Sequence, residues 1–457
     1  MTNDQSRRAF LKRSVALSAA GGATPFVMNL AAIGEAAAAT NTDYKALVCI
    51  FLLGGNDYAN TVTPYDQASY NEYQRLRSVL AYGRDSLTPT LLNPTTALGG
   101  GRQYALGPAM SSLMPVFDAG KLAVVLNVGT LVQPTTKAQY QARNAPLPPK
   151  LFSHNDQQSY WQSSSPEGAT SGWGGRLGDL FQGGNGTGAL TCINASGSAV
   201  YLSGRSAVQY AVSTNGPVAL SANNSLFGSS AGSTALKSLM AGSRPSLFEN
   251  EHARVSRRSL DLAAQVTSAL GGAPALTAEF PAGNTLADQL RVVARMISVS
   301  SELGAKRQVF FVSTGGFDTH DKLNAEHPVL LTRVSTAMRA FYDTTVQLGV
   351  ADRVTAFTAS DFGRTLVANT DGSDHGWGSM HFAMGGAVRG KQIYGTSPVV
   401  ADNGPDDVGQ GRLLPSISVD QYAATLASWF GVSAGDLPTV LPNIGNYDAS
   451  TRNLGFV

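Results

Sequence analysis

The sequence predicts an α/β fold with a mostly parallel central sheet covered by helices on both faces. Apolar runs bounded by Gly, Asp or Asn recur along the chain, which is typical of buried strands. The runs span residues 45–53, 121–128, 189–193, 308–314, 353–358 and 382–388. Segments with amphipathic helical spacing lie between several of these runs, and strands that alternate with helices favour a parallel sheet.

Three helices are predicted from apolar spacing and from residues that begin or end helices. The first follows Asn284 as a possible cap, the second ends near Gly349, and the third stops at Gly431. Their apolar positions are Leu286, Leu290, Val293 and Ile297; Leu331, Val334, Met338 and Phe341; and Tyr422, Leu426, Trp429 and Phe430.

The first 39 residues resemble a twin-arginine export signal. Arg7 and Arg8 precede an apolar stretch, 15–39, that Gly, Pro, Asn and Glu residues interrupt too often for a stable membrane span. Small residues at 37–39 offer a cleavage site. We therefore expect the twin-arginine export machinery as a partner and a periplasmic or extracellular product.

About 418 residues remain after this cut, enough for one large α/β domain, 40–457. The stretch 196–246 is crowded with Ser, Gly and Asn and contains short β-like pieces, so we expect a small inserted β-rich cap there. Residues 248–270 have helical spacing and would return the chain to the core. As a rival interpretation, the insertion caps the substrate of an exported polysaccharide- or lipid-modifying enzyme.

Charge and cysteine content narrow the function classes. Removal of residues 1–39 leaves 29 basic and 29 acidic residues, so the remaining chain is formally neutral. This balance argues against nucleic acid or an anionic membrane as the main partner. Cys49 lies in an apolar run and is predicted to be an inert core thiol, while a disulfide with Cys192 stays open.

Acids and histidines gather in one part of this charge-poor chain. Three of the six histidines, His320, His375 and His381, stand near Asp318, Asp361 and Asp374. Oxygen and imidazole ligands together suit zinc, manganese or another first-row cation. The sequence therefore predicts a metal site.

The expected strands place several acids at one edge of the sheet. Asp318 and Asp361 each follow a predicted strand, and Asp57 follows the first strand in the chain. Ligands of open α/β sheets bind outside the carboxyl ends of the strands, so these acids should converge. For Asp57, a role as a cap or turn residue is an equal alternative.

Ser153 and His154 add a hydroxyl and an imidazole upstream of these motifs. A hydroxyl near a cation becomes a usable nucleophile because the metal lowers its pKa. For His154, a purely structural pairing with Asp156 is the alternative to catalysis.

Six motifs in this order resemble the DUF1501 family of exported bacterial proteins, which is itself similar to the alkaline phosphatase and sulfatase superfamily. They are Gly54-Gly55-Asn56-Asp57 with Asn60-Thr61-Val62-Thr63-Pro64, Phe152-Ser153-His154, Gly172-Trp173-Gly174-Gly175-Arg176, Gly315-Gly316-Phe317-Asp318-Thr319-His320, Ser360-Asp361-Phe362-Gly363-Arg364-Thr365 and Asp374-His375-Gly376. The resemblance implies an α/β/α sandwich, one or two divalent cations (Zn, Mn, Ca or Mg), and hydrolysis of anionic phosphate or sulfate esters.

The resemblance also implies roles for single residues. Asp57 resembles the early metal-binding aspartate of the superfamily, and Asp318 and His320 resemble the pair that holds the hydrolytic metal. Asp361 resembles the aspartate of the second metal, but Phe362 stands where the superfamily usually has histidine. His375 or His381 could restore that imidazole, and Asp374 could add an oxygen ligand.

The expected reaction is metal-assisted displacement at tetrahedral phosphorus or sulfur. Ser153 or a water would attack, His154 would act as acid, base or ligand, and Arg364 would hold an anionic oxygen. The alternative from another class is a secreted binding or assembly protein with a purely structural cation, which the replacement at Phe362 favours.

Overall fold

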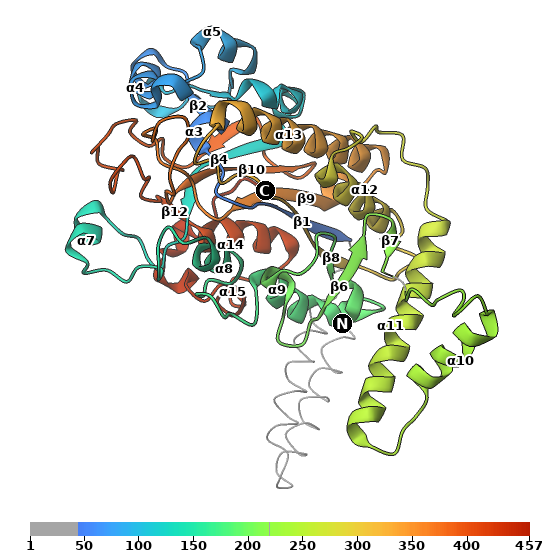
Figure 1. The fold of residues 1–457 in the computed structure, drawn as a ribbon. Coiled ribbons are helices and arrows are strands. Elements are labelled where there is room, and N and C mark those ends of the chain that lie inside the picture. Colours follow the sequence, from blue (N-terminus) through green and yellow to red (C-terminus); the bar gives the residue numbers. More distant parts are fainter. Residues whose placement is uncertain (1–43, 219) are drawn as a thin grey trace, which may run out of the picture.

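The computed structural model describes residues 44–218 and 220–457, so the expected export signal lies outside the described residues. Its centre is a ten-stranded sheet in the order β11-β4-β10-β9-β1-β8-β5-β6-β7, with β12 beside β4 (Figure 1). The strands are β1 (Lys45–Leu52), β4 (Leu122–Gly129), β5 (Cys192–Asn194), β6 (Gln209–Ser213), β7 (Gly216–Pro217), β8 (Arg307–Thr314), β9 (Val354–Ser360), β10 (Ser379–Gly385), β11 (Gln392–Tyr394) and β12 (Ile417–Ser418).

The sheet is mostly parallel, which confirms the predicted fold class. Strand β1 pairs in parallel with β8 on one side and with β9 on the other. Strand β10 runs antiparallel to both of its neighbours, β4 and β9, and β7 runs antiparallel to β6. The strand predicted at 382–388 begins earlier, at Ser379, and the strand predicted at 189–193 is shifted to Cys192–Asn194.

Strand β1 shows why both faces of the sheet are covered. Ala46, Val48, Ile50 and Leu52 pack into one apolar core, and the alternate residues Leu47, Cys49 and Phe51 pack into another. Because successive side chains of a strand point to opposite faces, a strand that is apolar at every position needs a helical layer on each side.

Two helical layers provide this cover (Figure 1). Helices α12 (Thr285–Ser298) and α13 (Leu323–Gln347) pack into the first core. Helices α9 (Trp173–Phe181), α14 (Val419–Phe430) and α15 (Leu437–Val440) pack into the second. The side chain of Asn284 accepts hydrogen bonds from the first turn of α12, and Gly431 follows the last residue of α14, as the sequence predicted.

Shorter elements surround these layers. They are α3 (Tyr58–Thr61), α4 (Gln67–Arg77), α5 (Arg84–Leu87), α6 (Met114–Asp118), α7 (Lys137–Ala142) and α8 (His154–Ser163), with a small antiparallel pair of strands, β2 (Val62–Pro64) and β3 (Tyr104–Leu106). In the described part of the chain, no helix has the length and apolar character needed to cross a membrane.

The Ser-, Gly- and Asn-rich stretch 196–246 is part strand and part helix. Strand β6 joins the edge of the central sheet beside β5, and β7 turns back along it. Residues Ser230–Ala241 instead form helix α10, whose first turn is capped by the Ser229 side chain. Helix α11 (Leu247–Gly271) then returns the chain to the core through Leu262, Val266 and Leu270, so the predicted return helix is confirmed.

Cys49 and Cys192 are separate buried thiols in this fold. Burial raises the pKa of the Cys192 thiol to about 12 and raises that of Cys49 as well. A thiol that stays protonated at neutral pH is a poor nucleophile and metal ligand. The predicted inert role of Cys49 is consistent with this environment.

Asp420 lies in the first turn of α14 and is fully buried. Its buried carboxyl group should make the free energy of unfolding depend on pH. Burial raises its carboxyl pKa from 3.8 to about 6, although hydrogen bonds from Ser164 and Asn443 oppose the rise. The folded protein therefore holds a proton that the unfolded chain has lost, and the free energy of unfolding should fall by up to about 3 kcal/mol as pH rises from 4 to 6.

Asp420→Asn should remove this component of the pH dependence. Denaturant unfolding of wild type and variant between pH 4 and pH 8 measures it, with the exposed Asp448→Asn as the matched control. Parallel stability curves for wild type and Asp420→Asn would contradict the assignment.

Candidate metal centre

The candidate site lies at one edge of the central sheet, where four strands end or begin. Strands β1, β8 and β9 are parallel, so their carboxyl ends share this edge, and the antiparallel β10 begins there. The loops 54–57, 315–320 and 361–364 follow the first three strands, and the segment 374–378 precedes β10. Isolated β-bridges join Asn56 to Gly363 and Arg364 to His375.

Glycines at the end of β1 allow these loops to pack tightly. Gly54 has a φ of +116°, and a Cβ atom there would lie 2.5 Å from the backbone nitrogen of Asp318. Gly55 has a φ of +86°, and its Cβ would lie 2.4 Å from the ring of Phe362. Both the backbone angle and the space therefore require glycine.

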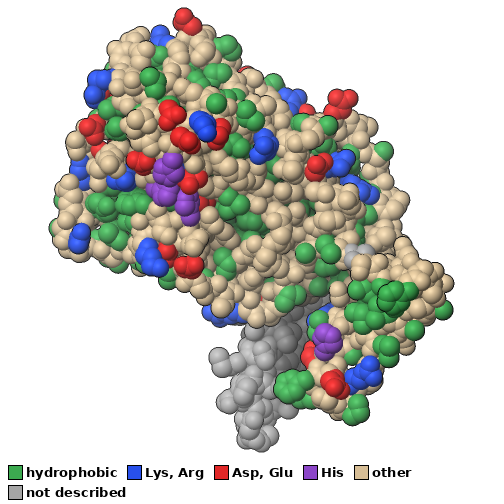
Figure 2. Space-filling view, in the orientation of Figure 1, with side chains coloured by type: hydrophobic (Ala, Val, Ile, Leu, Met, Phe, Trp, Pro, Cys, Tyr) green, Lys and Arg blue, Asp and Glu red, His purple; other side chains and the backbone are tan. Residues whose placement is uncertain are grey.

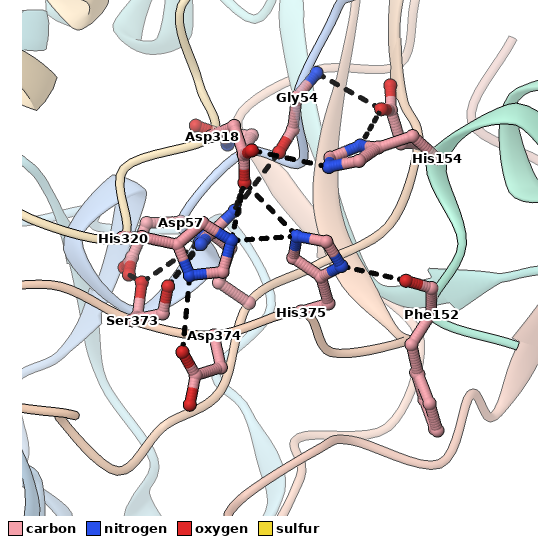
Figure 3. A network of polar contacts seen from close by, with 12 residues as sticks. Gly54, Asp57, Phe152, His154, Asp318, His320, Ser373, Asp374 and His375 are labelled. Atoms are coloured by element: carbon pink, nitrogen blue, oxygen red, sulfur yellow. Dashed lines mark hydrogen bonds and ion pairs between the residues drawn. The ribbon is translucent and has the colours of Figure 1, made fainter.

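Three histidines surround the carboxylate of Asp318 (Figure 3). Its Oδ1 atom lies 3.0 Å from His320 Nε2 and 3.2 Å from His375 Nε2. Its Oδ2 atom lies 3.4 Å from His154 Nε2. Ligand atoms of His154, Asp318 and His375 all fall within 4.8 Å of one another. His320 adjoins this group, because its Nε2 is 2.9 Å from His375 Nε2.

The other nitrogen of each ring faces a hydrogen-bond acceptor. His154 Nδ1 lies 2.7 Å from Asp361 Oδ2, and His320 Nδ1 lies 3.2 Å from Asp374 Oδ1. His375 Nδ1 lies 2.7 Å from the carbonyl oxygen of Phe152. A carbonyl oxygen only accepts, so His375 Nδ1 carries the hydrogen, and the carboxylates favour the same tautomer in the other two rings.

This arrangement turns three Nε2 lone pairs toward each other and toward a carboxylate. Lone pairs and a negative charge repel unless a cation or a proton lies among them. Imidazoles whose Nδ1–H is held by a carboxylate or a backbone carbonyl are the usual form of metal-binding histidines in proteins. The donor set of three imidazoles and one carboxylate fits a first-row divalent cation, zinc above all.

Neighbouring charges, hydrogen bonds and burial shift the pKa values of side chains in the cluster. Burial raises the pKa of Asp318, but the hydrogen bond and charge of Arg364 outweigh it, so the net pKa is lowered. The hydrogen bond to Asp361 raises the pKa of His154, whereas burial lowers that of His375. At neutral pH Asp318 is therefore a carboxylate that can serve as a ligand.

Asp361 fixes the orientation of the His154 ring through its contact with Nδ1. Its side chain is fully buried, and Oδ2 accepts from Gly54 N at 3.1 Å and from Gln158 Nε2 at 2.8 Å as well as facing His154. Phe362, next in sequence, packs its ring 4.9 Å from the ring of His154 and 4.7 Å from that of His375. Asp361 therefore orients a histidine, and Phe362 forms the apolar wall behind the cluster.

Asp57 does not join the cluster, which corrects the expected metal-binding role. Its Oδ1 caps α3 by accepting from Asn60 N at 3.0 Å, while Oδ2 pairs with Arg77 at 2.8 Å and accepts from Ser373 at 2.8 Å. All of these groups are buried, so the carboxylate is satisfied within the protein. The cap, one of the two alternatives for Asp57, is the role observed.

His381 also lies apart from the cluster. It is buried on β10, with its ring centroid 4.7 Å from that of Trp161 and 6.0 Å from that of Tyr422. Burial lowers its pKa to about 3, so it is a neutral core residue. His375 supplies the imidazole at the site instead.

The side chains of Arg364 and Ser153 both bind groups within the protein. Arg364 is fully buried, and its donors reach Asp318 at 2.6 Å, Gly54 O at 3.1 Å and Ser373 O at 2.9 Å. It therefore fixes Asp318 and does not face an external anion. Ser153 Oγ donates to Asp156 at 3.0 Å, so Asp156 pairs with the serine and not with His154.

Two groups that contribute to the site were not identified from the sequence. The carbonyl of Phe152 is a backbone group and has no residue-type signal. Gln158 stands four residues after His154, and residues at this spacing share a helix face, so the beginning of α8 could have indicated it. Asp374, expected as an oxygen ligand, contacts His320 Nδ1 and Asn369 instead.

The cluster is open to solvent. Figure 2 shows histidine side chains gathered on one face of the molecule with acidic side chains around them. The Asp318 and His320 side chains are 43% and 45% exposed, and His154 is 28% exposed. The cluster is therefore part of the protein surface and is not enclosed in the core.

The model of the family described as "Protein of unknown function (DUF1501)" matches residues 44–427. No curated protein matches the chain. Three similar solved structures are Ps i-CgsB in complex with k-i-k-neocarrahexaose (TM-score 0.36, 8% identity, 88% of this chain and 77% of that one), the lipoteichoic acid synthase LtaP from Listeria monocytogenes (0.33, 9%, 87% and 74%) and the PsFucS1 sulfatase from Pseudoalteromonas sp. (0.34, 11%, 89% and 72%). Likenesses this distant carry no argument about function.

The buried pair of Asp57 and Arg77 predicts a large effect on stability. Asp57→Ala leaves the guanidinium buried without its carboxylate and should lower the free energy of unfolding by roughly 3–5 kcal/mol. Asp66→Ala is the matched control, because Asp66 also caps a helix but pairs with Arg102 only at 4.0 Å. Its cost should be about 1 kcal/mol.

Denaturant unfolding at neutral pH measures both variants. Equal losses in Asp57→Ala and Asp66→Ala would show that the pair with Arg77 is not a special stabilising contact.

Proposed function

The chain belongs to the DUF1501 family, whose description gives no function, and we propose from its site that it is a metal-dependent hydrolase of phosphate or sulfate esters. The observation that carries the proposal is the convergence of three imidazole Nε2 atoms on Asp318, each ring fixed through its Nδ1. His154, His320, His375 and Asp318 would hold one divalent cation. The other expected ligands are engaged elsewhere: Asp57 pairs with Arg77, Asp361 faces His154 Nδ1, and His381 packs against Trp161.

A bound cation would supply Lewis-acid stabilisation of negative charge on the ester. The chain's own residues supply orientation. Asp361, Asp374 and the Phe152 carbonyl hold the three rings, and Arg364 holds Asp318. Because Asp361 and Arg364 are fully buried, His154 and Asp318 are held in place before a ligand arrives, which reduces the cost of binding.

Ser153 is the candidate nucleophile. It lies between Phe152 and His154, which both contact the cluster, and its hydroxyl donates to Asp156. Attack by Ser153 Oγ on phosphorus or sulfur would form a seryl ester and break the bond to the leaving oxygen, with the serine proton passing to Asp156. The leaving oxygen would take a proton from solvent, and water would then hydrolyse the seryl ester and restore Ser153. Ser153→Ala abolishes turnover in this scheme and leaves metal content unchanged.

Metal content tests the proposal most directly. Asp318→Asn and His320→Ala each remove one donor and should reduce bound metal to a small fraction of the wild-type stoichiometry. Asp374→Asn weakens only the partner of His320, so metal affinity should fall by roughly 10- to 100-fold. Elemental analysis after metal loading and dialysis measures all three, with the exposed His252→Ala as control.

Full metal content in both Asp318→Asn and His320→Ala would reject this site. Hydrolysis by the wild-type protein is measured in a separate assay. The substrates are phosphate monoesters, phosphate diesters and sulfate esters, with zinc, manganese, calcium or magnesium added.

A second candidate function is that of a secreted binding or assembly protein with a structural cation. The favouring observation is that Arg364 is buried and directs its donors to Asp318, Gly54 and Ser373, so it cannot hold an external anionic oxygen. Stoichiometric metal without turnover of any ester in the panel would support this candidate over the hydrolase.

We further propose that residues 1–39 direct export by the twin-arginine route to the periplasm or beyond. Replacing both Arg7 and Arg8 by Lys should strongly reduce export, because the pair is the recognised feature of such signals. Immunoblots of cytoplasmic and exported fractions measure the effect, and Arg13→Lys is the control. Unchanged export of the double variant would contradict the route.

A further inference from the structure

A polar cleft adjoins the metal centre on the side of β5 and β8. Its volume is about 460 Å³, within the range of roughly 300–1,000 Å³ typical of small-molecule sites. Leu53, which precedes Gly54, and Asn155, which follows His154, both line it. Gln158 lines it as well and donates to Asp361, so one residue joins the cleft wall to the histidine cluster.

One wall of the cleft is a polar stripe on α8. Asn155, Gln158, Ser159 and Gln162 recur at the spacing that puts side chains on one helix face, and all four line the cleft. The facing wall comes from the carboxyl ends of β5 and β8 and includes Ser198 and Ser313. The lining is therefore rich in amides and hydroxyls.

Two amide groups are left free to bind a ligand. Gln162 is 8% exposed, and its Oε1 accepts from Tyr201 N at 3.0 Å. Within residues 44–218 and 220–457, its Nε2 has no hydrogen-bond partner and so remains a donor. Gln158 uses Nε2 on Asp361, and its Oε1 likewise lacks a described partner and remains an acceptor.

The charge of the lining disfavours anionic ligands. Glu167 is the charged residue among the described residues that line the cleft, and it contacts Asn155 at 3.4 Å. A single carboxylate repels anions, and the cleft wall supplies no Lys or Arg side chain to bind them. Leu53, Val200 and Phe311 add apolar surface beside the polar groups.

We propose that this cleft binds a neutral polyhydroxylated group, that is, the carbohydrate part of an ester whose charged end lies at the histidine cluster. The inference rests on the proposed hydrolase function for the position of the ester and extends it to the substrate class. Hydroxyl groups both donate and accept, so they match an unpaired amide donor and an unpaired amide acceptor, and the carbon faces of a sugar match the apolar residues.

The test compares sugar and aryl substrates on the full chain. Gln162→Met removes the free amide with little change in volume, and Ser313→Ala removes a hydroxyl of the facing wall. Each should raise KM for a sulfate or phosphate ester of a neutral sugar about fivefold, the equivalent of one hydrogen bond. KM for the matching aryl ester should not change, and the exposed Gln74→Met is the control.

Binding without turnover separates this inference from the proposed function. Calorimetry with neutral oligosaccharides on metal-stripped wild-type protein should show binding that Gln162→Met and Ser313→Ala weaken, even if no ester is hydrolysed. If neutral oligosaccharides do not bind, or if both variants bind them as wild type does, the inference is overturned. Preferential binding of anionic oligosaccharides would overturn it as well. If Gln162→Met does not fold, the oligosaccharide affinity of Ser313→Ala relative to wild type is the deciding measurement.

Discussion

The candidate site depends on one carboxylate at the edge of the sheet. Asp318 contacts Arg364 from the buried side and three imidazoles from the open side. The guanidinium keeps Asp318 ionised, and the ionised carboxylate in turn gives the Nε2 atoms a common centre. If Asp318 were moved, the loops after β8 and β9 and the segment before β10 would lose the group that they share.

Buried charges form a second layer that holds this centre in place. The Ser373 carbonyl accepts from Arg364, and the Ser373 hydroxyl donates to Asp57, which pairs with Arg77. Each charged group in this series of contacts has an opposite charge or a hydrogen-bond partner, as buried ionic groups require. The polar network therefore links α4 to the site, although α4 supplies no group to the histidine cluster.

The sequence predicted the parallel sheet and the edge where acids meet, because apolar runs and the residues that follow them are local signals. It could not separate Asp57 from Asp318, since both follow buried strands and only the fold brings Arg77 to Asp57. His381 was misplaced for a related reason. Its position within β10 turns the ring to the core between Trp161 and Tyr422, and period-two placement depends on a strand boundary that sequence gives poorly.

The departure at Phe362 fits a site for one cation. Its ring fills the space against Gly55, where not even a Cβ atom could be added, and makes tilted contacts with two histidine rings. An imidazole there would add a ligand beside Asp361, whereas the phenyl ring leaves Asp361 to orient His154.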